Sequence, residues 1–238
     1  MRIPSNPSRR TGALLFGCAL LSLSRLSDPA SADSGEDKIE ALQSLVREGV
    51  LLEGIQLVGF RLEGIDLKGA RMPRAAMSRA KLARADLRGA TLEGADLTEA
   101  VLQEADLNGA ILRGANLAQA DLWKATLDGA DLRAVDFSHA VLRSARFGRA
   151  DLAGSKFVGA DLASADFRSA NLAGADFTGA LLRRTDFAGA DLRGATLEGT
   201  TGWTSIQSLE GANIHGIVRP PVGFVLWALN SSGAVDSP

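Results

Sequence analysis

The 238-residue sequence contains no tyrosine, one cysteine and two histidines, and only 5% of its residues are aromatic. One cysteine cannot form an internal disulfide, and two histidines supply too few ligands for a His/Cys zinc site. With so few aromatic side chains the chain cannot build a large aromatic core, and its Ala, Leu, Gly, Asp and Arg favour a stacked repeat architecture. An excess of basic residues is also missing: 26 Lys and Arg face 28 Asp and Glu, which disfavours binding to nucleic-acid phosphates.

The first 32 residues have the pattern of a secretory signal peptide. Arg2, Arg9 and Arg10 precede an apolar run over 12–23, and the small residues 30–32 (Ala-Ser-Ala) come before Asp33. The run is shorter than the roughly 20 residues that a membrane-spanning helix needs. We therefore expect cleavage after residue 32, an exported product that is periplasmic or secreted, and no permanent transmembrane segment. The mature chain would carry 22 bases against 27 acids, a net charge of −5.

The export route is left open by two further patterns. Arg9 and Arg10 resemble a twin-arginine signal, but the hydrophobic pair that usually follows is missing, which favours the general secretory route. Residues 15–18 resemble a lipoprotein cleavage box with Cys18 as the lipidated residue. Because the apolar run continues beyond Cys18, we prefer to interpret this cysteine as a small apolar residue of the cleaved segment.

A five-residue period holds from Leu52 to Leu197 without an insertion, which gives 30 consecutive units. The central residue of each unit is Leu, Met or Phe, and Ala stands two residues earlier in 23 units. Glycine occupies the second position after the central residue in 16 units, where a turn can require a positive φ. A period of five fits neither a helix nor a strand, so the chain must turn once per unit, with Ala and the central residue pointing inward.

This pattern closely resembles the pentapeptide repeat family, whose consensus is Ala, Asp or Asn, Leu and two free residues. Units 85–89 (ADLRG), 95–99 (ADLTE) and 115–119 (ANLAQ) match it directly. The resemblance implies an all-β fold: a right-handed quadrilateral parallel β-helix, or pentapeptide repeat solenoid, in which four units form one 20-residue coil.

The phenylalanines of the repeat give separate support for an even number of units per coil. From Phe137 to Phe187 Phe and Leu alternate at the central position. Four units per coil would therefore stack Phe137, Phe157 and Phe177 on one side, with the intervening phenylalanines on the opposite side. The 30 units would then form 7.5 coils. At about 4.8 Å between neighbouring strands, the rod would be about 36 Å long, with a packed interior that has no room for a substrate.

Both flanks of the repeat have the pattern of caps, which a solenoid needs to protect its open ends. Apolar residues at helical spacing before Gly49 predict an N-terminal capping helix over about 35–48: Ile39, Leu42, Leu45 and Val46. At the other end the register breaks over 200–207, one out-of-phase unit follows at 212–214, and the apolar stretch 222–229 is predicted to cap the C-terminus or to pair with a second copy.

The predicted organisation has four parts: a signal peptide at 1–32, an N-terminal capping helix at 33–49, the pentapeptide repeat β-helix at 50–199, and a C-terminal cap and tail at 200–238.

No arrangement of reactive side chains indicates an enzyme, and we predict no catalytic residues, no metal site and no cofactor. His139 lies at an outward corner, and a register break separates it from His215. Asp residues 20 apart, such as Asp66 and Asp86, would stack and offer a site for a cation such as calcium. We prefer a structural role, in which these carboxylates accept turn N–H groups and nearby arginines offset their charge: Arg88, Arg113, Arg133, Arg168 and Arg193.

Two functions fit these observations. The first is a non-enzymatic protein-interaction scaffold of the cell envelope, in a bacterial periplasm, with an unknown envelope protein or a second copy of the chain as its partner. The second is implied by the resemblance, because some pentapeptide repeat proteins mimic duplex DNA and bind or protect type II topoisomerases. Arginines interleaved with the acids, together with the export signal, disfavour this alternative, since a DNA mimic should be continuously acidic.

One predicted face differs from the other three, and we call it the Trp123 face. It has few corner glycines, and its outward residues form the predicted partner-binding set: Val101, Trp123, Val141, Arg143, Leu181 and Arg183. Trp and Arg are frequent in binding hot spots, and an apolar stripe with a basic rim is typical of a docking surface. The alternative is that these are ordinary exposed residues of a strand.

Overall fold

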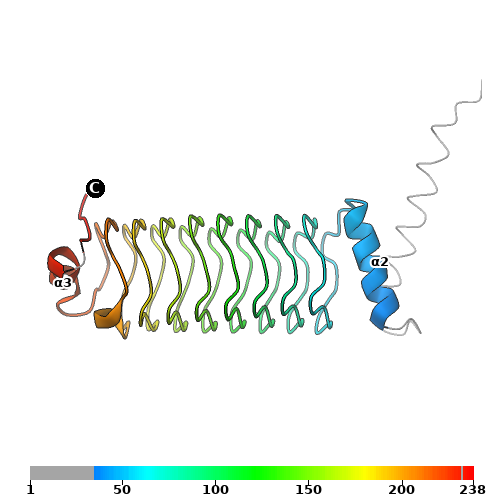
Figure 1. The fold of residues 1–238 in the computed structure, drawn as a ribbon, viewed down its shortest axis with the longest axis horizontal. Helices are drawn as coiled ribbons and strands as arrows, with labels where there is room; N and C mark the ends of the chain where they lie inside the picture. The colour runs from blue at the N-terminus through cyan, green and yellow to red at the C-terminus, as the bar shows by residue number, and fades with distance from the viewer. Residues whose placement is uncertain (1–34, 232) are drawn as a thin grey trace, which may run out of the picture.

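The computed structural model describes residues 35–231 and 233–238, so the predicted signal peptide at 1–32 and Cys18 lie outside the described residues. The chain forms one straight rod with a helix at each end (Figure 1). The helices are α2 (Gly35–Arg47), the short 3₁₀ helix η1 (Trp203–Ser205) and α3 (Phe224–Ser231). Between α2 and η1 the described chain consists of single parallel bridges and turns.

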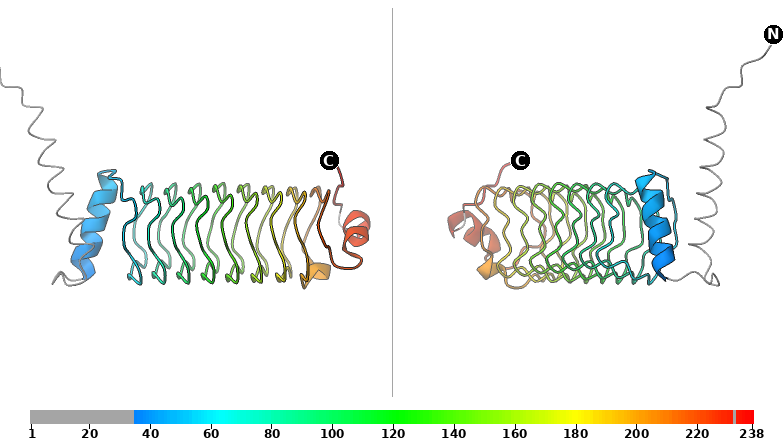
Figure 2. Two further views of the ribbon diagram at one scale, coloured as in Figure 1. Left: turned by 180° about the vertical axis from the view of Figure 1, so that it is seen from behind. Right: turned by 45° about the vertical axis from the view of Figure 1, so that its right-hand side comes forward.

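Four five-residue units make one coil of the rod, as the phenylalanine pattern predicts. Parallel bridges join residues 20 apart on all four sides, from Leu51↔Arg71 to Leu181↔Thr201. Hydrogen bonds run along the rod in both directions: the Leu82 N–H donates to the Val101 carbonyl at 2.7 Å, and the Val101 N–H donates to the Ala80 carbonyl at 2.9 Å. The coils are visible as a regular stack in both views of Figure 2.

The ladder continues beyond residue 199 with a changed spacing. Asp186↔Ser208, Asp191↔Asn213 and Thr196↔Val218 pair residues that are 22 apart. Two extra residues around η1 account for the change. The unit at 212–214, which the sequence places out of phase, is therefore back in the ladder.

We name each of the four faces after one of its residues. The Leu132 face has central residues at every twentieth position from 52 to 192, and the Phe157 face from 57 to 197. The Trp123 face has them from 62 to 182, and the Phe147 face from 67 to 187. The Phe157 and Phe147 faces lie opposite each other because they are two units apart in a four-unit coil.

All 30 corners of the repeat have a positive φ, including the 14 that are not glycine. At a typical corner the Ala85 N–H donates to the Leu82 carbonyl at 3.0 Å, and Arg84 between them has a φ of 59°. A positive φ at the third residue is the signature of a type II β-turn. The coil imposes this conformation on every residue type, so the glycines relieve strain but do not determine where the turns occur.

The core is a set of aligned columns that ends in a stack of phenylalanines. Phe157 stacks on Phe137 with ring centroids 5.2 Å apart and on Phe177 at 4.9 Å. It also meets Phe147 and Phe167 of the opposite face edge to face, at 6.3 and 5.6 Å. All four partners are fully buried. The even-unit stacking expected from the sequence is confirmed by these contacts.

Ser155 is the one described residue with a buried side-chain hydroxyl that lacks a hydrogen-bond partner. It occupies an inward position where most units have Ala, whereas buried Thr185 donates its hydroxyl to the Leu162 carbonyl at 3.0 Å. We expect Ser155→Ala to stabilise the fold by about 1 kcal/mol, because it removes an unsatisfied buried polar group. The measurement is the midpoint of thermal unfolding. Thr185→Ala is the control and should not stabilise, and a lower midpoint for Ser155→Ala would contradict this expectation.

The two helices lie at the ends of the rod (Figures 1 and 2). Leu42 and Leu45 of α2 are buried in the same cluster as the first coils, and α2 ends at Arg47, one residue before the predicted end. At the far end Phe224 of α3 is buried and packs edge to face against Trp203 of η1 at 5.7 Å. Within the described residues, no helix has the length and apolar character needed to cross a membrane.

Candidate partner-binding surface

The structure brings all six predicted partner-binding residues onto the Trp123 face, but the apolar stripe expected there is interrupted. Along the bridge row Val101 pairs with Asp121, Asp121 with Val141, Val141 with Asp161, and Asp161 with Leu181. Aspartates therefore alternate with the apolar residues. Val141 is exposed, and Val101 and Leu181 are half-buried. The binding role of the six residues stays a prediction.

Trp123 is half-buried near the middle of its face. The Lys124 ammonium lies 4.3 Å from the centroid of its ring, a cation–π contact that holds one face of the indole. The backbone N–H of Trp123 donates to Asp121 Oδ1 at 3.1 Å, which fixes the main chain that carries the ring. The indole is thus presented in a defined position with low entropy to lose on binding.

The two aspartates of this face have partners within the fold. Asp121 Oδ2 accepts a hydrogen bond from Gln103 Nε2 at 2.6 Å, and Asp161 Oδ2 pairs with Arg143 Nε at 2.5 Å. Arg143 is therefore engaged with a carboxylate of its own face. Arg183, by contrast, is exposed and has no acidic partner within 4.0 Å among the described residues.

The Trp123 face has more corners without glycine than any other face. Six of its seven corners have a positive φ without glycine: Arg84, Glu104, Lys124, Ser144, Ser164 and Arg184. The Phe147 face has only two such corners, Arg149 and Ser169. A left-handed conformation costs a non-glycine residue about 1 kcal/mol or more. The Trp123 face therefore retains more backbone strain than the Phe147 face and in return holds more outward side chains.

The stacked Asp carboxylates of the other faces bind groups of the fold itself, namely turn N–H groups and arginines. Asp86 Oδ1 accepts the Arg88 N–H at 3.1 Å, and the same turn contact recurs along the rod. Arg133 pairs with Asp131 at 2.7 Å and reaches Asp151 of the next coil at 3.4 Å. Hydrogen bonds from Arg88 and Arg133 lower the pKa of Asp86 and of Asp131 below their ordinary values. Among the described residues, no group of three or more His, Cys, Asp or Glu could hold a metal ion.

The Phe147 face departs from this arrangement at Arg146 and Gly148. Arg146 stands where half of the units have Asp or Asn, and the Gly148 N–H donates instead to Asp128 of the preceding coil, at 2.8 Å. The other carboxylate oxygen of Asp128 pairs with Arg146 at 2.7 Å. A Cβ at position 148 would lie 2.9 Å from Asp128 Oδ1, and the φ of Gly148 is not positive. A side chain at position 148 would therefore displace the Asp128 carboxylate from its hydrogen bond, and the backbone conformation itself does not demand glycine.

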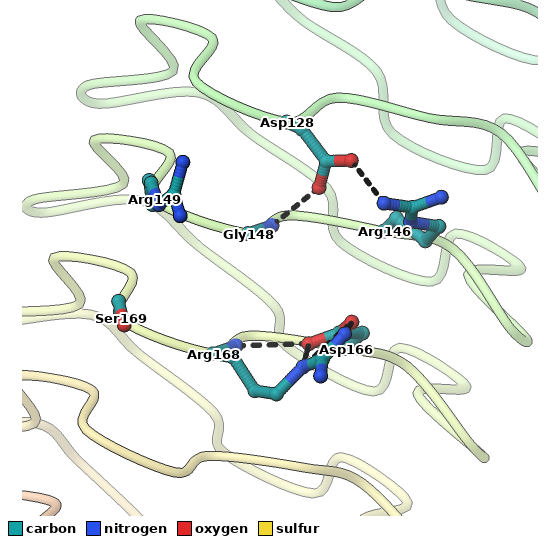
Figure 3. A pocket seen from close by; sticks show the side chains of 7 residues that line it. All are labelled: Asp128, Arg146, Gly148, Arg149, Asp166, Arg168 and Ser169. Atoms are coloured by element: carbon teal, nitrogen blue, oxygen red, sulfur yellow. Dashed lines mark hydrogen bonds and ion pairs between the residues drawn. The ribbon is translucent and has the colours of Figure 1, made fainter.

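Gly148 lines an open hollow of about 410 Å³ that extends over three successive coils, which Figure 3 shows from close by. Arg149, Asp166, Arg168 and Ser169 complete its lining. Burial raises the pKa of Asp166, but hydrogen bonds from Arg168 outweigh this and leave it below its ordinary value. Ser169 has no histidine beside it in this lining.

The histidines lie far apart, and one has a partner that the sequence does not reveal. His139 packs over Gly159, where an added Cβ would come within 2.7 Å of its Nδ1. His215 Nδ1 lies 2.8 Å from Asp236 Oδ1, because the bridge Asn213↔Val235 brings the C-terminal tail beside the last coil. This pair fastens the tail, and only the 22-residue spacing after η1 could have indicated it.

Comparison with known proteins identifies the repeat. A family model described as pentapeptide repeats matches residues 75–114, 110–149, 145–184 and 160–199. No curated protein matches the chain.

Two solved structures show how far the likeness extends. HetL, a pentapeptide repeat protein involved in heterocyst differentiation regulation from the cyanobacterium Nostoc sp. strain PCC 7120, is 29% identical over 75% of this chain and 80% of its own, with a TM-score of 0.69. QnrB1, a plasmid-mediated fluoroquinolone resistance protein, is 17% identical in one trypsin-treated form, over 79% of this chain and 88% of its own, with a TM-score of 0.63. At that identity the second likeness extends to the fold alone.

Proposed function

Because the chain belongs to the pentapeptide repeat family, we propose that it is a non-enzymatic scaffold of the cell envelope that binds a protein partner through the Trp123 face. The family relation also implies that its four-sided coil is right-handed, with α2 and the segment around α3 as caps against edge-to-edge association. Its rod is rigid along its length, since every coil is hydrogen-bonded to its neighbours.

The observation that carries this proposal is the set of six non-glycine corners on one face. Backbone strain persists where the surrounding structure enforces it and often marks functional positions. Here the strain is concentrated on the face that also presents Trp123, held beside Lys124. A flat face with an ordered indole and cationic corners has the composition of a binding hot spot.

The envelope location rests on the sequence pattern of residues 1–32. Cell fractionation and intact-mass analysis test it, with an exported product that begins at Asp33 as the expected result. A lipid-bearing product that begins at Cys18 would instead establish the lipoprotein alternative. A full-length cytoplasmic product would contradict the envelope location.

The partner role is tested with the double variant Trp123→Ala and Val141→Ser, which removes the central indole and the exposed valine of the next coil. We expect a native circular dichroism spectrum together with loss of either self-association or capture of the envelope partner. Val158→Ser, an outward valine on the Phe157 face, is the matched control and should change neither. Unchanged light scattering and unchanged pull-down for the double variant would refute the role of this face.

The second candidate function is binding to a type II topoisomerase by DNA mimicry, which the fold shared with QnrB1 brings into consideration. The charge distribution argues against it. Carboxylates of the Leu132 and Phe147 faces pair with arginines of their own or the next coil, as in Arg133–Asp131, Arg168–Asp166 and Arg193–Asp191. On these two faces such pairs remove the continuous negative surface that a mimic of DNA phosphates would need.

A further inference from the structure

The Trp123 face is the one positively charged side of a slightly acidic rod. Its outward and corner positions between 61 and 184 carry seven Lys and Arg against four Asp and Glu, a balance of +3. The corresponding positions of the Phe157 face carry two bases against five acids, a balance of −3. The remaining two faces have equal charges or one more acid. The positive potential is therefore confined to one side.

On this face every acid has a partner within the fold, whereas more than half of the cations have no carboxylate partner in the described part of the chain. Glu63 and Glu104 pair with Arg61 and Arg84, and the two aspartates are held by Gln103 and Arg143. Among the described residues, four cations of the face have no carboxylate within 4.0 Å: Lys81, Lys124, Arg183 and Arg184. Of these four, Lys81, Arg183 and Arg184 remain available to a partner, while Lys124 lies over the Trp123 ring.

The available cations are spread along the rod with the indole between them. From Lys81 to Arg183 the face spans five coils, or about 24 Å at about 4.8 Å per coil. Lys124 lies beside Trp123 near the centre, and Arg183 and Arg184 lie together at one end. An extended chain of about seven residues has this length.

From this arrangement we propose that the Trp123 face binds an extended, acidic protein segment that carries carboxylates at its ends and apolar side chains in its middle. The carboxylates pair with Lys81 at one end and with Arg183 and Arg184 at the other, while the apolar side chains contact Trp123, Val101 and Val141. Charge complementarity of this kind fixes the register and speeds association. This inference rests on the proposed function and deepens it by naming the chemistry of the partner.

A protein segment fits better than an anionic membrane surface. Asp121 and Asp161 lie in the middle of the bridge row, between the apolar residues. A layer of anionic lipid headgroups would cover the whole face, and its negative charges would be repelled by both carboxylates. A segment with alternating side chains can instead place its apolar residues opposite Val101 and Val141 and keep its own carboxylates away from both aspartates.

The probe for this proposal is a fluorescein-labelled nine-residue peptide with two Glu at each end and alternating Leu and Thr between them. Its binding to the mature protein is measured by fluorescence anisotropy. We expect saturable binding that weakens as salt is raised. The variant Arg183→Glu with Arg184→Glu should weaken binding at least tenfold. The control Arg71→Glu with Lys156→Glu reverses two exposed cations on other faces and should change it less than twofold, and the peptide with Lys in place of Glu should not bind.

Several outcomes would overturn the proposal. Absence of peptide binding, equal weakening by both charge-reversal pairs, or binding that depends on Arg183 and Arg184 only for phosphatidylglycerol vesicles or duplex DNA would each do so. The proposed function and this inference can be distinguished by experiment. If the captured envelope partner is lost in the Trp123→Ala and Val141→Ser variant but is insensitive to Arg183→Glu with Arg184→Glu, the face binds a partner and only the acidic chemistry is wrong.

Discussion

Phe157→Ala is expected to lower the free energy of unfolding by about 3–5 kcal/mol, the range typical of removing a fully buried phenyl ring. Phe157 is fully buried and contacts four other phenylalanines, two by stacking and two edge to face. Removing its ring leaves a cavity in the middle of the stack and also removes aromatic contacts worth about 0.5–1.5 kcal/mol per pair. The main chain of a β-helix cannot collapse into such a cavity, because every coil is fixed by hydrogen bonds to both neighbours.

Chemical and thermal denaturation of the mature protein measure this effect. Lys156→Ala, one residue away and exposed on the same unit, is the control and should change the stability by less than about 0.5 kcal/mol. A change below about 1 kcal/mol for Phe157→Ala would mean that the phenylalanine stack does not hold the rod together.

Ala120→Phe is expected to destabilise the fold by about 1–3 kcal/mol or more, through overpacking. Ala120 is completely buried beneath the Trp123 face, and the inward positions of the coils before and after it are also fully packed alanines, Ala100 and Ala140. Its N–H and carbonyl groups are both bonded, to the Leu117 carbonyl and the Val141 N–H, so the backbone has no freedom to move away. A phenyl ring therefore has no accessible space at this position.

Gln119→Phe is the matched control, because Gln119 is the exposed corner residue immediately before Ala120. Gln119 already holds a φ of 61° with a side chain attached, so this corner does not depend on glycine. The thermal midpoint of Gln119→Phe should stay close to that of the wild type. Equal destabilisation by the two substitutions would contradict the inward placement of Ala120.

The regular part of the fold could be predicted from the sequence because one local rule repeats. Each unit buries its central residue and its Ala, and the alternation of Phe and Leu from Phe137 to Phe187 selects four units per coil. The contacts between Phe137 and Phe157 and between Phe157 and Phe167 confirm that choice. The structural role predicted for the aspartates follows from the same rule, and the turn contact of Asp86 with the Arg88 N–H is one instance of it.

The features that sequence reasoning missed depend on contacts between coils at positions where the pattern is broken. Asp128 satisfies the Gly148 N–H from the coil before, which the 145–149 unit alone could not indicate. The pairing of His215 with Asp236 depends on a spacing that changes only at η1. On the Trp123 face, the 20-residue coil already places Asp121 and Asp161 in one row with the apolar residues, so the interruption of the stripe was available from the sequence, and the bridges establish it.

The central claim is that this rod uses one face to bind a protein partner, and site-specific photocrosslinking tests it most directly. A photoreactive phenylalanine analogue is placed at Trp123 in the full chain in its native cells, and in separate variants at Ser138 of the Phe157 face and Arg133 of the Leu132 face, both in the same row of their units. We predict a discrete adduct with another protein, or with a second copy of the chain, from position 123 and none from the two control positions. Adducts from all three positions alike, or from none of them, would contradict the claim.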